Sequence, residues 1–220
     1  MSPFISIVIP FYGTADPVLL QRCIDSIRQQ GMEEGIYEII VADDNGKGLG
    51  GARNQGIRQA TGTYLMFVDA DDYLFPNLSY CFSYLLKYTP DICSFQMCEV
   101  NRAGVIPQSF NYKWEVYESG AEYMSKNNFM GTAWRHFFSR SFLNIHGLAF
   151  AESCFHEDED FVAKAYCLAS TTLITDYPVY AYFRSSSSII HERALQVRLK
   201  RLNDFRGMLY RVRNLLCSLE

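Results

Sequence analysis

The sequence predicts an α/β fold in which a mixed, mostly parallel sheet is flanked by helices. Apolar runs of strand length alternate with segments of helical periodicity in the first hundred residues, which indicates strand–helix–strand units. The run at residues 64–68 is apolar without interruption, as is typical of a parallel strand buried on both faces. With 220 residues and 49% hydrophobic content, the chain can build one sizeable core.

The N-terminal elements follow from local signals. Residues 4–10 form an apolar run that ends in a proline, which cannot donate to a strand ladder. Asp16 followed by Pro17 is a favourable helix start, and Gly31 is a favourable stop. A second strand is expected at residues 37–42. Because a helix connects the two strands, they are expected to run parallel in a right-handed unit.

The later elements follow from the same signals. Helices are expected at residues 52–60, from 76 onward, at 118–127, at 154–169 and at 191–219, a strand is expected at 91–98, and a loop or hairpin at 101–114. The last helix repeats apolar residues at helical spacing, and we expect most of this stripe to pack against the domain. Its members are Leu195, Leu199, Leu202, Phe205, Leu209, Val212 and Leu216.

Composition narrows the function classes. The formal net charge of −4 gives no global basic field for binding nucleic acid. The seven cysteines lack the CxxC spacing of a zinc site and sit mostly in apolar runs, so we interpret them as reduced core residues. We find neither a signal-peptide pattern nor a run of 18 apolar residues, and we therefore expect a cytoplasmic protein.

A cluster of carboxylates follows the strand at residues 64–68. Asp69, Asp71 and Asp72 come directly after this strand, and Asp43 with Asp44 follows the preceding strand. Ligands of open α/β sheets bind beyond the carboxyl ends of the strands, so these acids are expected at a binding crevice. Their mutual repulsion favours a divalent cation with oxygen ligands, although a solvated turn with helix-capping aspartates is the alternative.

A glycine-rich stretch offers a second interpretation. Gly46, Gly48 and Gly51 match the dinucleotide-binding fingerprint between a strand and a helix, which would indicate an NAD-dependent oxidoreductase. Two carboxylates, Asp43 and Asp44, precede the glycines, and they would oppose a pyrophosphate. We therefore rank this interpretation second.

Ordered motifs occupy residues 6–12, 39–44, 52–56 and 60–72, followed by Trp134 with Phe138, by Glu157-Asp158-x-x-Phe161 and by Tyr180-x-Tyr182-x-Arg184. These motifs resemble those of the family 2 inverting glycosyltransferases, in particular their bacterial polysaccharide-making branch. The resemblance implies a GT-A-like fold with a C-terminal helical and aromatic acceptor lobe. It suggests a nucleotide-sugar-binding half at residues 1–98, an acceptor-binding and catalytic-base half at 99–190, and an amphipathic helix at 191–220.

The chain departs from the family pattern after its second strand. The family usually places a helix and an edge strand between the paired aspartates and the Ala52-Arg53-Asn54 motif, whereas only a few residues intervene here. Either a βα unit is deleted, or a segment is missing from the chain. A deletion of this edge unit would leave the central strands intact but would put part of the base-binding wall in doubt.

The resemblance implies roles for donor-binding residues. Asp71 would hold Mn²⁺ or Mg²⁺ with help from Asp69, which would also accept from the ribose hydroxyls, while Asp72 would support or cap the loop. Arg53 would steady the base-side loop or a phosphate, with a surface salt bridge as the alternative. The remaining donor contacts are assigned to Pro10, Phe11, Tyr12, Asp43, Ala70 and Arg184, with Asp43 accepting from uracil N3 and Tyr12 stacking on the base.

The resemblance also implies the acceptor side. Asp158 would act as the catalytic base, with Glu157 as the alternative because the acidic run makes the register ambiguous, and like-charge crowding would raise a pKa there. Trp134 would contact the acceptor, unless it is a core residue. The expected partners are a UDP-sugar donor and a glycan or lipid-linked acceptor. The basic C-terminal helix allows peripheral contact with the inner face of a membrane.

Three rivals to a metal-dependent glycosyltransferase remain open at this point. A nicotinamide oxidoreductase would bind NAD without a metal requirement. A non-catalytic nucleotide-sugar-binding module would bind UDP without turnover. A structural interaction domain would bind neither ligand.

Overall fold

The computed structural model describes residues 2–11, 16–100, 112–128, 131–183 and 194–219. The strands are β1 (Ile5–Phe11), β2 (Tyr37–Asp43), β3 (Tyr64–Phe67), β4 (Tyr73–Leu74), β5 (Ile92–Val100), β6 (Trp114–Tyr117), β7 (His136–Ser139) and β8 (Thr172–Phe183). The helices are α1 (Pro17–Arg28), α2 (Gly48–Gln59), α3 (Tyr80–Tyr88), α4 (Gly120–Lys126), α5 (Arg140–Ile145), α6 (Glu157–Leu168) and α7 (Leu195–Leu219), with a 3₁₀ turn η1 (Ala133–Arg135).

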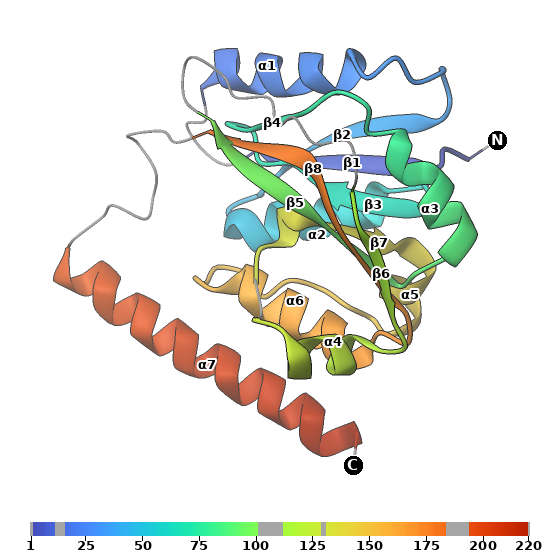
Figure 1. Cartoon of the computed structure of the whole chain (residues 1–220). Helices are drawn as coiled ribbons and strands as arrows, with labels where there is room; N and C mark the ends of the chain where they lie inside the picture. Colours follow the sequence, from blue (N-terminus) through green and yellow to red (C-terminus); the bar gives the residue numbers. More distant parts are fainter. Residues whose placement is uncertain (1, 12–15, 101–111, 129–130, 184–193, 220) are drawn as a thin grey trace.

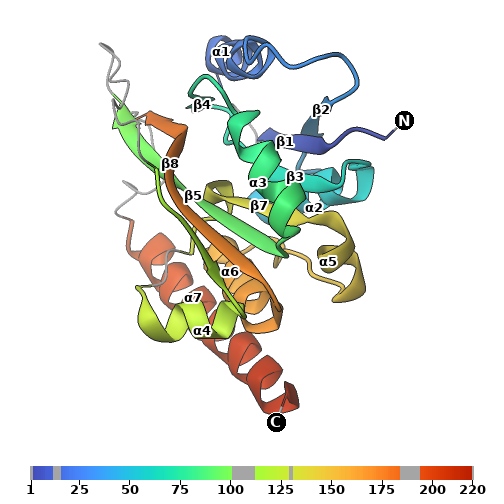
Figure 2. The same cartoon turned by 45° about the vertical axis from the view of Figure 1, so that its right-hand side comes forward.

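The described strands form one twisted sheet in the order β2-β1-β3-β7-β5-β8-β4, and β6 pairs with β8 (Figures 1 and 2). β1 runs parallel to β2 and β3, as the sequence predicts. β7 then enters antiparallel between β3 and β5, while β5 and β8 run parallel. The sheet is therefore mixed, and in the described residues its parallel part is limited to β2-β1-β3 and β5-β8.

Helices cover both faces of the sheet, which creates two cores. Residues of α1 and α3 pack with alternate side chains of β1, including Ile5, Ile7 and Ile9. Val8 of β1 points to the opposite face and packs with residues of α5 and α6. β1 is therefore buried on both faces, which explains its continuous apolar run. Since β1, β2 and β3 run parallel, their carboxyl ends reach the same edge of the sheet.

Several element boundaries differ from the expected ones. Asp16 caps α1 by accepting from Val18 N at 2.9 Å, as expected. α2, however, begins at Gly48 rather than at residue 52, and α3 begins at Tyr80 rather than at 76. Leu86 of α3 is 65% exposed, whereas its neighbour Leu85 is buried.

The apolar stripe of α7 was expected to pack against the domain, and this prediction is wrong. Six of its seven members are exposed: Leu195, Leu199, Leu202, Phe205, Leu209 and Leu216. Among the described residues of α7, only Met208 is buried. No helix in the described ranges combines the length and the apolar character that crossing a membrane requires.

Buried His136 gives a prediction about acid stability. Its Nδ1 lies 3.0 Å from Thr132 O, which can only accept, so Nε2 is the acceptor that faces Tyr166 OH at 3.1 Å. Burial, aided by Arg135, lowers the pKa of His136 to about 3. Since the unfolded chain binds this proton near pH 6.5, the contribution of His136 to the free energy of unfolding is expected to fall by about 1.4 kcal/mol per pH unit as the pH drops below 6.5.

Urea unfolding at several pH values tests this expectation. His136→Gln cannot take up the proton, so the stability it loses between pH 6.5 and 4 is expected to be smaller than the loss in the wild type by the contribution of His136. His146→Gln, at an exposed histidine of the loop after α5, is the control and should keep the wild-type slope. Equal slopes for His136→Gln and the wild type would contradict the prediction.

Candidate active site

The sheet edge beyond β1, β2 and β3 gathers carboxylates that are far apart in the sequence. Asp69 follows β3, whereas Glu157 and Asp158 begin α6. All three contact Arg53 of α2: Nη2 donates to Asp69 Oδ1 at 3.0 Å, and Nη1 donates to Glu157 Oε1 at 3.1 Å and to Asp158 Oδ1. The structure therefore joins two acidic motifs that lie about ninety residues apart in the chain.

Arg53 is a buried cation among three acids. Its side chain is 1% exposed, which excludes the alternative of a surface salt bridge. Burial lowers the pKa of the guanidinium, but the charges of Asp158, Asp69 and Glu157 outweigh this effect and hold that pKa above its ordinary value. One guanidinium cannot neutralise three carboxylates, so the cluster keeps excess negative charge that favours a further cation.

The start of α6 orients the acidic pair. Asp158 Oδ2 accepts from Ala133 N at 3.2 Å, while its Oδ1 faces Arg53. Burial raises the pKa of Asp158, Arg53 opposes this shift, and Glu157 and Asp69 reinforce it, so the net direction is upward. A raised pKa is a property of a carboxylate that serves as a general base near neutral pH.

Asp72 and Tyr180 brace the acidic loop from inside. Asp72 is 1% exposed and accepts from Tyr180 OH and from Phe183 N, each at 2.7 Å. Tyr180 OH also accepts from Asp69 N at 3.1 Å. Asp72 therefore ties the loop to β8. Tyr180 lies in a sequence motif, but its role is not evident from the sequence because its partners Asp69 and Asp72 lie more than a hundred residues away.

Asp69 and Asp71 offer oxygen ligands that suit Mg²⁺ or Mn²⁺. Burial and the nearby Asp69 raise the pKa of half-buried Asp71, so a cation would stabilise its charged form. Arg22 donates to the Asp71 backbone carbonyl at 2.5 Å, which fixes the loop and leaves the carboxylate available. In the ranges described, no three His, Cys, Asp or Glu side chains converge on a metal position.

The other expected donor residues are distributed along the same edge. Pro10 and Phe11 end β1, and Ala70 lies within the acidic loop. Asp43 ends β2 and is exposed, and its Oδ1 accepts from Asn45 N at 2.7 Å, which organises the turn into α2. Two further expected donor residues lie outside the described part of the chain: Tyr12 and Arg184.

Trp134 packs beneath the acidic loop. It is 8% exposed and stacks on Tyr180 and Tyr182, with ring centroids 4.5 and 5.7 Å apart. Because Tyr180 holds Asp69 and Asp72, Trp134 supports the loop through this stack. Only the small exposed part of Trp134 is available to contact an acceptor, and this contact stays a prediction.

The glycines after β2 serve packing and turn formation. Gly46 and Gly48 have φ of +76° and +73°, and Gly48 N donates to Asp44 Oδ2 at 3.1 Å, so a carboxylate already occupies this helix start. A Cβ on Gly50 would lie 2.2 Å from Ala151 O, and one on Gly56 would lie 2.1 Å from a Val8 methyl. Gly50 therefore lets α2 approach the loop before α6 and Gly56 lets it approach β1, while the amide groups of residues 46–51 do not form an open pyrophosphate cradle.

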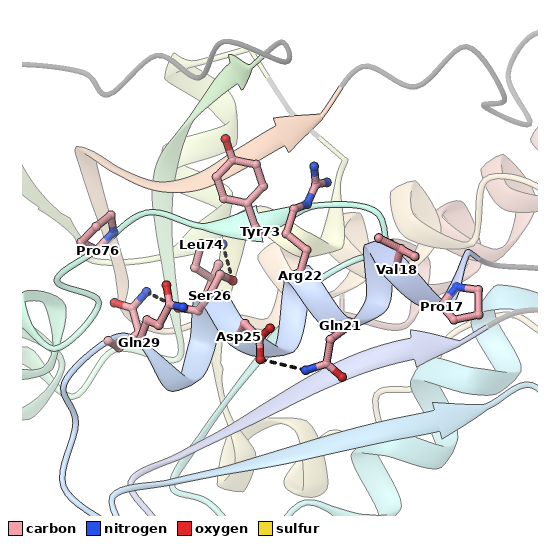
Figure 3. Close-up of a pocket in the computed structure, with 11 residues that line it drawn as sticks. Pro17, Val18, Gln21, Arg22, Asp25, Ser26, Gln29, Tyr73, Leu74 and Pro76 are labelled. Atoms are coloured by element: carbon pink, nitrogen blue, oxygen red, sulfur yellow. Dashed lines mark hydrogen bonds between the residues drawn. The ribbon is translucent and has the colours of Figure 1, made fainter.

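A groove of about 790 Å³ lies between α1 and the segment that contains β4 (Figure 3). Its lining includes Arg22 and Tyr73, and the Arg22 guanidinium lies 5.0 Å from the centre of the Tyr73 ring. A hydrogen bond from Gln21 to Asp25, 2.8 Å long, runs along the α1 side of the groove (Figure 3). Since none of the clustered carboxylates lines this groove, we assign the candidate active site to the edge around Arg53.

The mixed sheet, the Asp69-Ala70-Asp71 loop and the facing acidic pair together define a GT-A type of fold. The chain belongs to glycosyl transferase family 2, whose family model matches residues 6–47 and 44–144. The two matched segments overlap at residues 44–47, within the short link between β2 and α2.

Relatives and solved structures agree with this assignment. The chain is 28% identical over 227 residues to the uncharacterized glycosyltransferase EpsJ of Bacillus subtilis, covering 86% of this chain and 63% of EpsJ. It is 36% identical over 97 residues to the poly(ribitol-phosphate) beta-glucosyltransferase of Bacillus spizizenii, covering 32% of this chain and 15% of that protein.

The fold is similar to that of S. aureus TarS 1-349, with a TM-score of 0.69 at 21% identity, covering 83% of this chain and 60% of TarS 1-349. TarS 1-349 has also been solved with UDP and with UDP-GlcNAc. The chain thus spans less than two thirds of the length of EpsJ and of TarS 1-349.

Proposed function

We propose that this chain transfers a sugar from a UDP-sugar to a hydroxyl group of a glycan or lipid-linked acceptor, with inversion, in the synthesis of a surface polysaccharide. The observation that carries the proposal is the convergence of Asp69, Glu157 and Asp158 on buried Arg53. Family membership and the UDP complexes of TarS support the choice of donor.

On the donor side, Asp69 and Asp71 would hold Mn²⁺ or Mg²⁺ together with the diphosphate. Bound there, the metal would neutralise the charge that develops on the diphosphate leaving group. Asp69 would also accept from the ribose, and Asp43 from uracil N3. Arg53 keeps Asp69 in place, because its Nη2 donates to the same carboxylate.

On the acceptor side, Asp158 would take the proton of the attacking hydroxyl. A base that faces the donor across the reacting carbon suits in-line attack with inversion. The raised pKa of Asp158 favours this role. Glu157 contacts the same guanidinium and is the second candidate.

Calorimetric titration with UDP, with and without Mn²⁺, tests the donor site. The wild type is expected to bind UDP more tightly with Mn²⁺, and Asp71→Asn is expected to lose this dependence because a neutral amide is a weaker metal ligand. Asp25→Asn on α1 is the matched control, since its partner Gln21 can still donate to the amide oxygen.

The titration also separates the alternatives. Failure to bind UDP under either condition would overturn the proposal, and binding of NAD instead would support the oxidoreductase interpretation. Metal-dependent UDP binding without release of UDP from any UDP-sugar would identify a non-catalytic binding module.

A further inference from the structure

The C-terminal helix α7 has one face fixed to the domain. Arg211 Nε donates to Asp160 Oδ1 at 2.9 Å, and Asp160 is fully buried in α6. Asp204 Oδ2 accepts from Phe155 N at 2.9 Å in the loop that leads into α6. In both overall views α7 lies along the outer side of α6 (Figures 1 and 2). The helix therefore has a defined orientation on the domain.

A second face of α7 carries exposed leucines, and two of them, Leu209 and Leu216, border a groove shared with Glu159 and Ala163 of α6. Successive leucines on this face are three, four or seven residues apart, so they form one stripe along the helix. Their exposed fractions range from 46% to 69%: Leu195, Leu199, Leu202, Leu209 and Leu216. In Figures 1 and 2, α7 lies at the edge of the molecule, and no described element lies on its far side from α6. Five exposed leucines along one helix indicate an interaction site.

Positive charge is concentrated on the same helix. α7 carries six Lys and Arg residues and one acidic residue, although the whole chain has a net charge of −4. Arg198, Arg206 and Arg213 are exposed, and none of them pairs with a carboxylate within the described residues. The face is thus complementary to an anionic surface.

The positions of two arginines favour a membrane over a second copy of the chain. Arg206 and Arg213 lie within the leucine stripe, at the same spacing as the leucines. In a helix pair they would be desolvated at the seam without acidic partners, which is costly. At a bilayer surface, long arginine side chains can reach the headgroups while the leucines enter the acyl boundary.

We propose that the outer face of α7 docks this protein on a membrane surface rich in anionic lipid. The docking itself does not depend on glycosyl transfer. If the function proposed above also holds, docking brings the acidic pair close to the bilayer, because α7 contacts the loop before Glu157 and Asp158. Phe205 packs against His156 with ring centroids 5.2 Å apart, next to these acids. Lipid-linked acceptors would then be within reach.

Flotation of the protein with vesicles tests the proposal. We expect binding to vesicles of mixed phosphatidylcholine and phosphatidylglycerol, and much weaker binding to phosphatidylcholine alone. Leu202→Gln with Leu209→Gln is expected to weaken binding about tenfold or more, since two side chains no longer transfer from water. Arg206→Gln with Arg213→Gln is expected to weaken it by about fivefold for each charge removed.

A matched control removes exposed apolar area elsewhere. Leu86 and Ile145 are 65% and 79% exposed on α3 and α5, and changing both to Gln should leave vesicle binding unchanged. Equal binding of all variants, or equal binding to neutral and anionic vesicles, would overturn the proposal. A dimer in the absence of vesicles, detected by sedimentation velocity, would also overturn it if the leucine variant dissociated that dimer. The leucine stripe would then join two copies of the chain. Loss of UDP binding in the titration above would leave the vesicle result unaffected.

Discussion

Replacing Arg53 by methionine is expected to lower the free energy of unfolding by about 3 kcal/mol and to abolish UDP binding. Arg53 is the shared partner of Asp69, Glu157 and Asp158. Methionine fills a similar volume but leaves three partly buried carboxylates facing one another. Their repulsion would displace Asp69, the residue proposed to hold both ribose and metal.

Urea unfolding of a small set of variants measures the effect. Arg58→Met, at an exposed position of the same helix, is the control and should change stability by less than about 0.5 kcal/mol. Arg53→Lys is expected to fall between the wild type and Arg53→Met, because one ammonium cannot replace a fork that reaches both α6 and the loop after β3.

A double variant identifies the cause of the destabilisation. If unpaired carboxylates are responsible, adding Asp158→Asn to Arg53→Met removes one of the charges and should restore part of the lost stability. A double variant no more stable than Arg53→Met would show that lost packing, rather than charge, explains the change.

The N-terminal half of the fold is predictable because its signals are local. The strand at residues 64–68 is a continuous apolar run, and Asp16 with Pro17 caps α1 in the expected way. The sequence of β8 contains no local signal of this kind. It contains Asp176 and Pro178, and its pairing with β5 shifts register next to Gln96, so that neighbouring strands decide its structure rather than its own sequence.

The composition of the candidate site was predictable only in part. The acids at 69, 71, 157 and 158 stand out in the sequence, but the sequence does not reveal that a single side chain joins them. Arg53 has the signature of an exposed helical residue, and Arg22, which contacts the Asp71 carbonyl, lies outside every motif. The partner of a buried cation is determined by tertiary packing.

The helical spacing in α7 shows a related limit. The sequence reveals an apolar stripe but not which face of the helix the domain covers. Polar contacts decide this in the structure, since Asp204 and Arg211 fix the face that carries them. The leucine stripe therefore faces solvent.

Asp158→Asn is expected to lower turnover on the order of a thousandfold while UDP affinity changes little. The amide keeps the shape of the carboxylate and can still accept from Ala133 N, but it cannot take the proton of an acceptor hydroxyl. Because the pKa of Asp158 is raised, turnover of the wild type is expected to increase with pH above the usual range of a carboxylate, as the base becomes deprotonated.

Comparison with Glu157→Gln resolves the register of the acidic run. Both variants remove one negative charge next to Arg53, so a merely electrostatic effect on the cluster should be similar in the two. If Asp158 is the base, Glu157→Gln should retain turnover within about tenfold of the wild type, since it loses no proton acceptor. Release of UDP from a set of UDP-sugars at saturating Mn²⁺ provides the measurement. A thousandfold loss in Glu157→Gln alone would assign the base to Glu157, and turnover retained by both variants would exclude this acidic pair as the base.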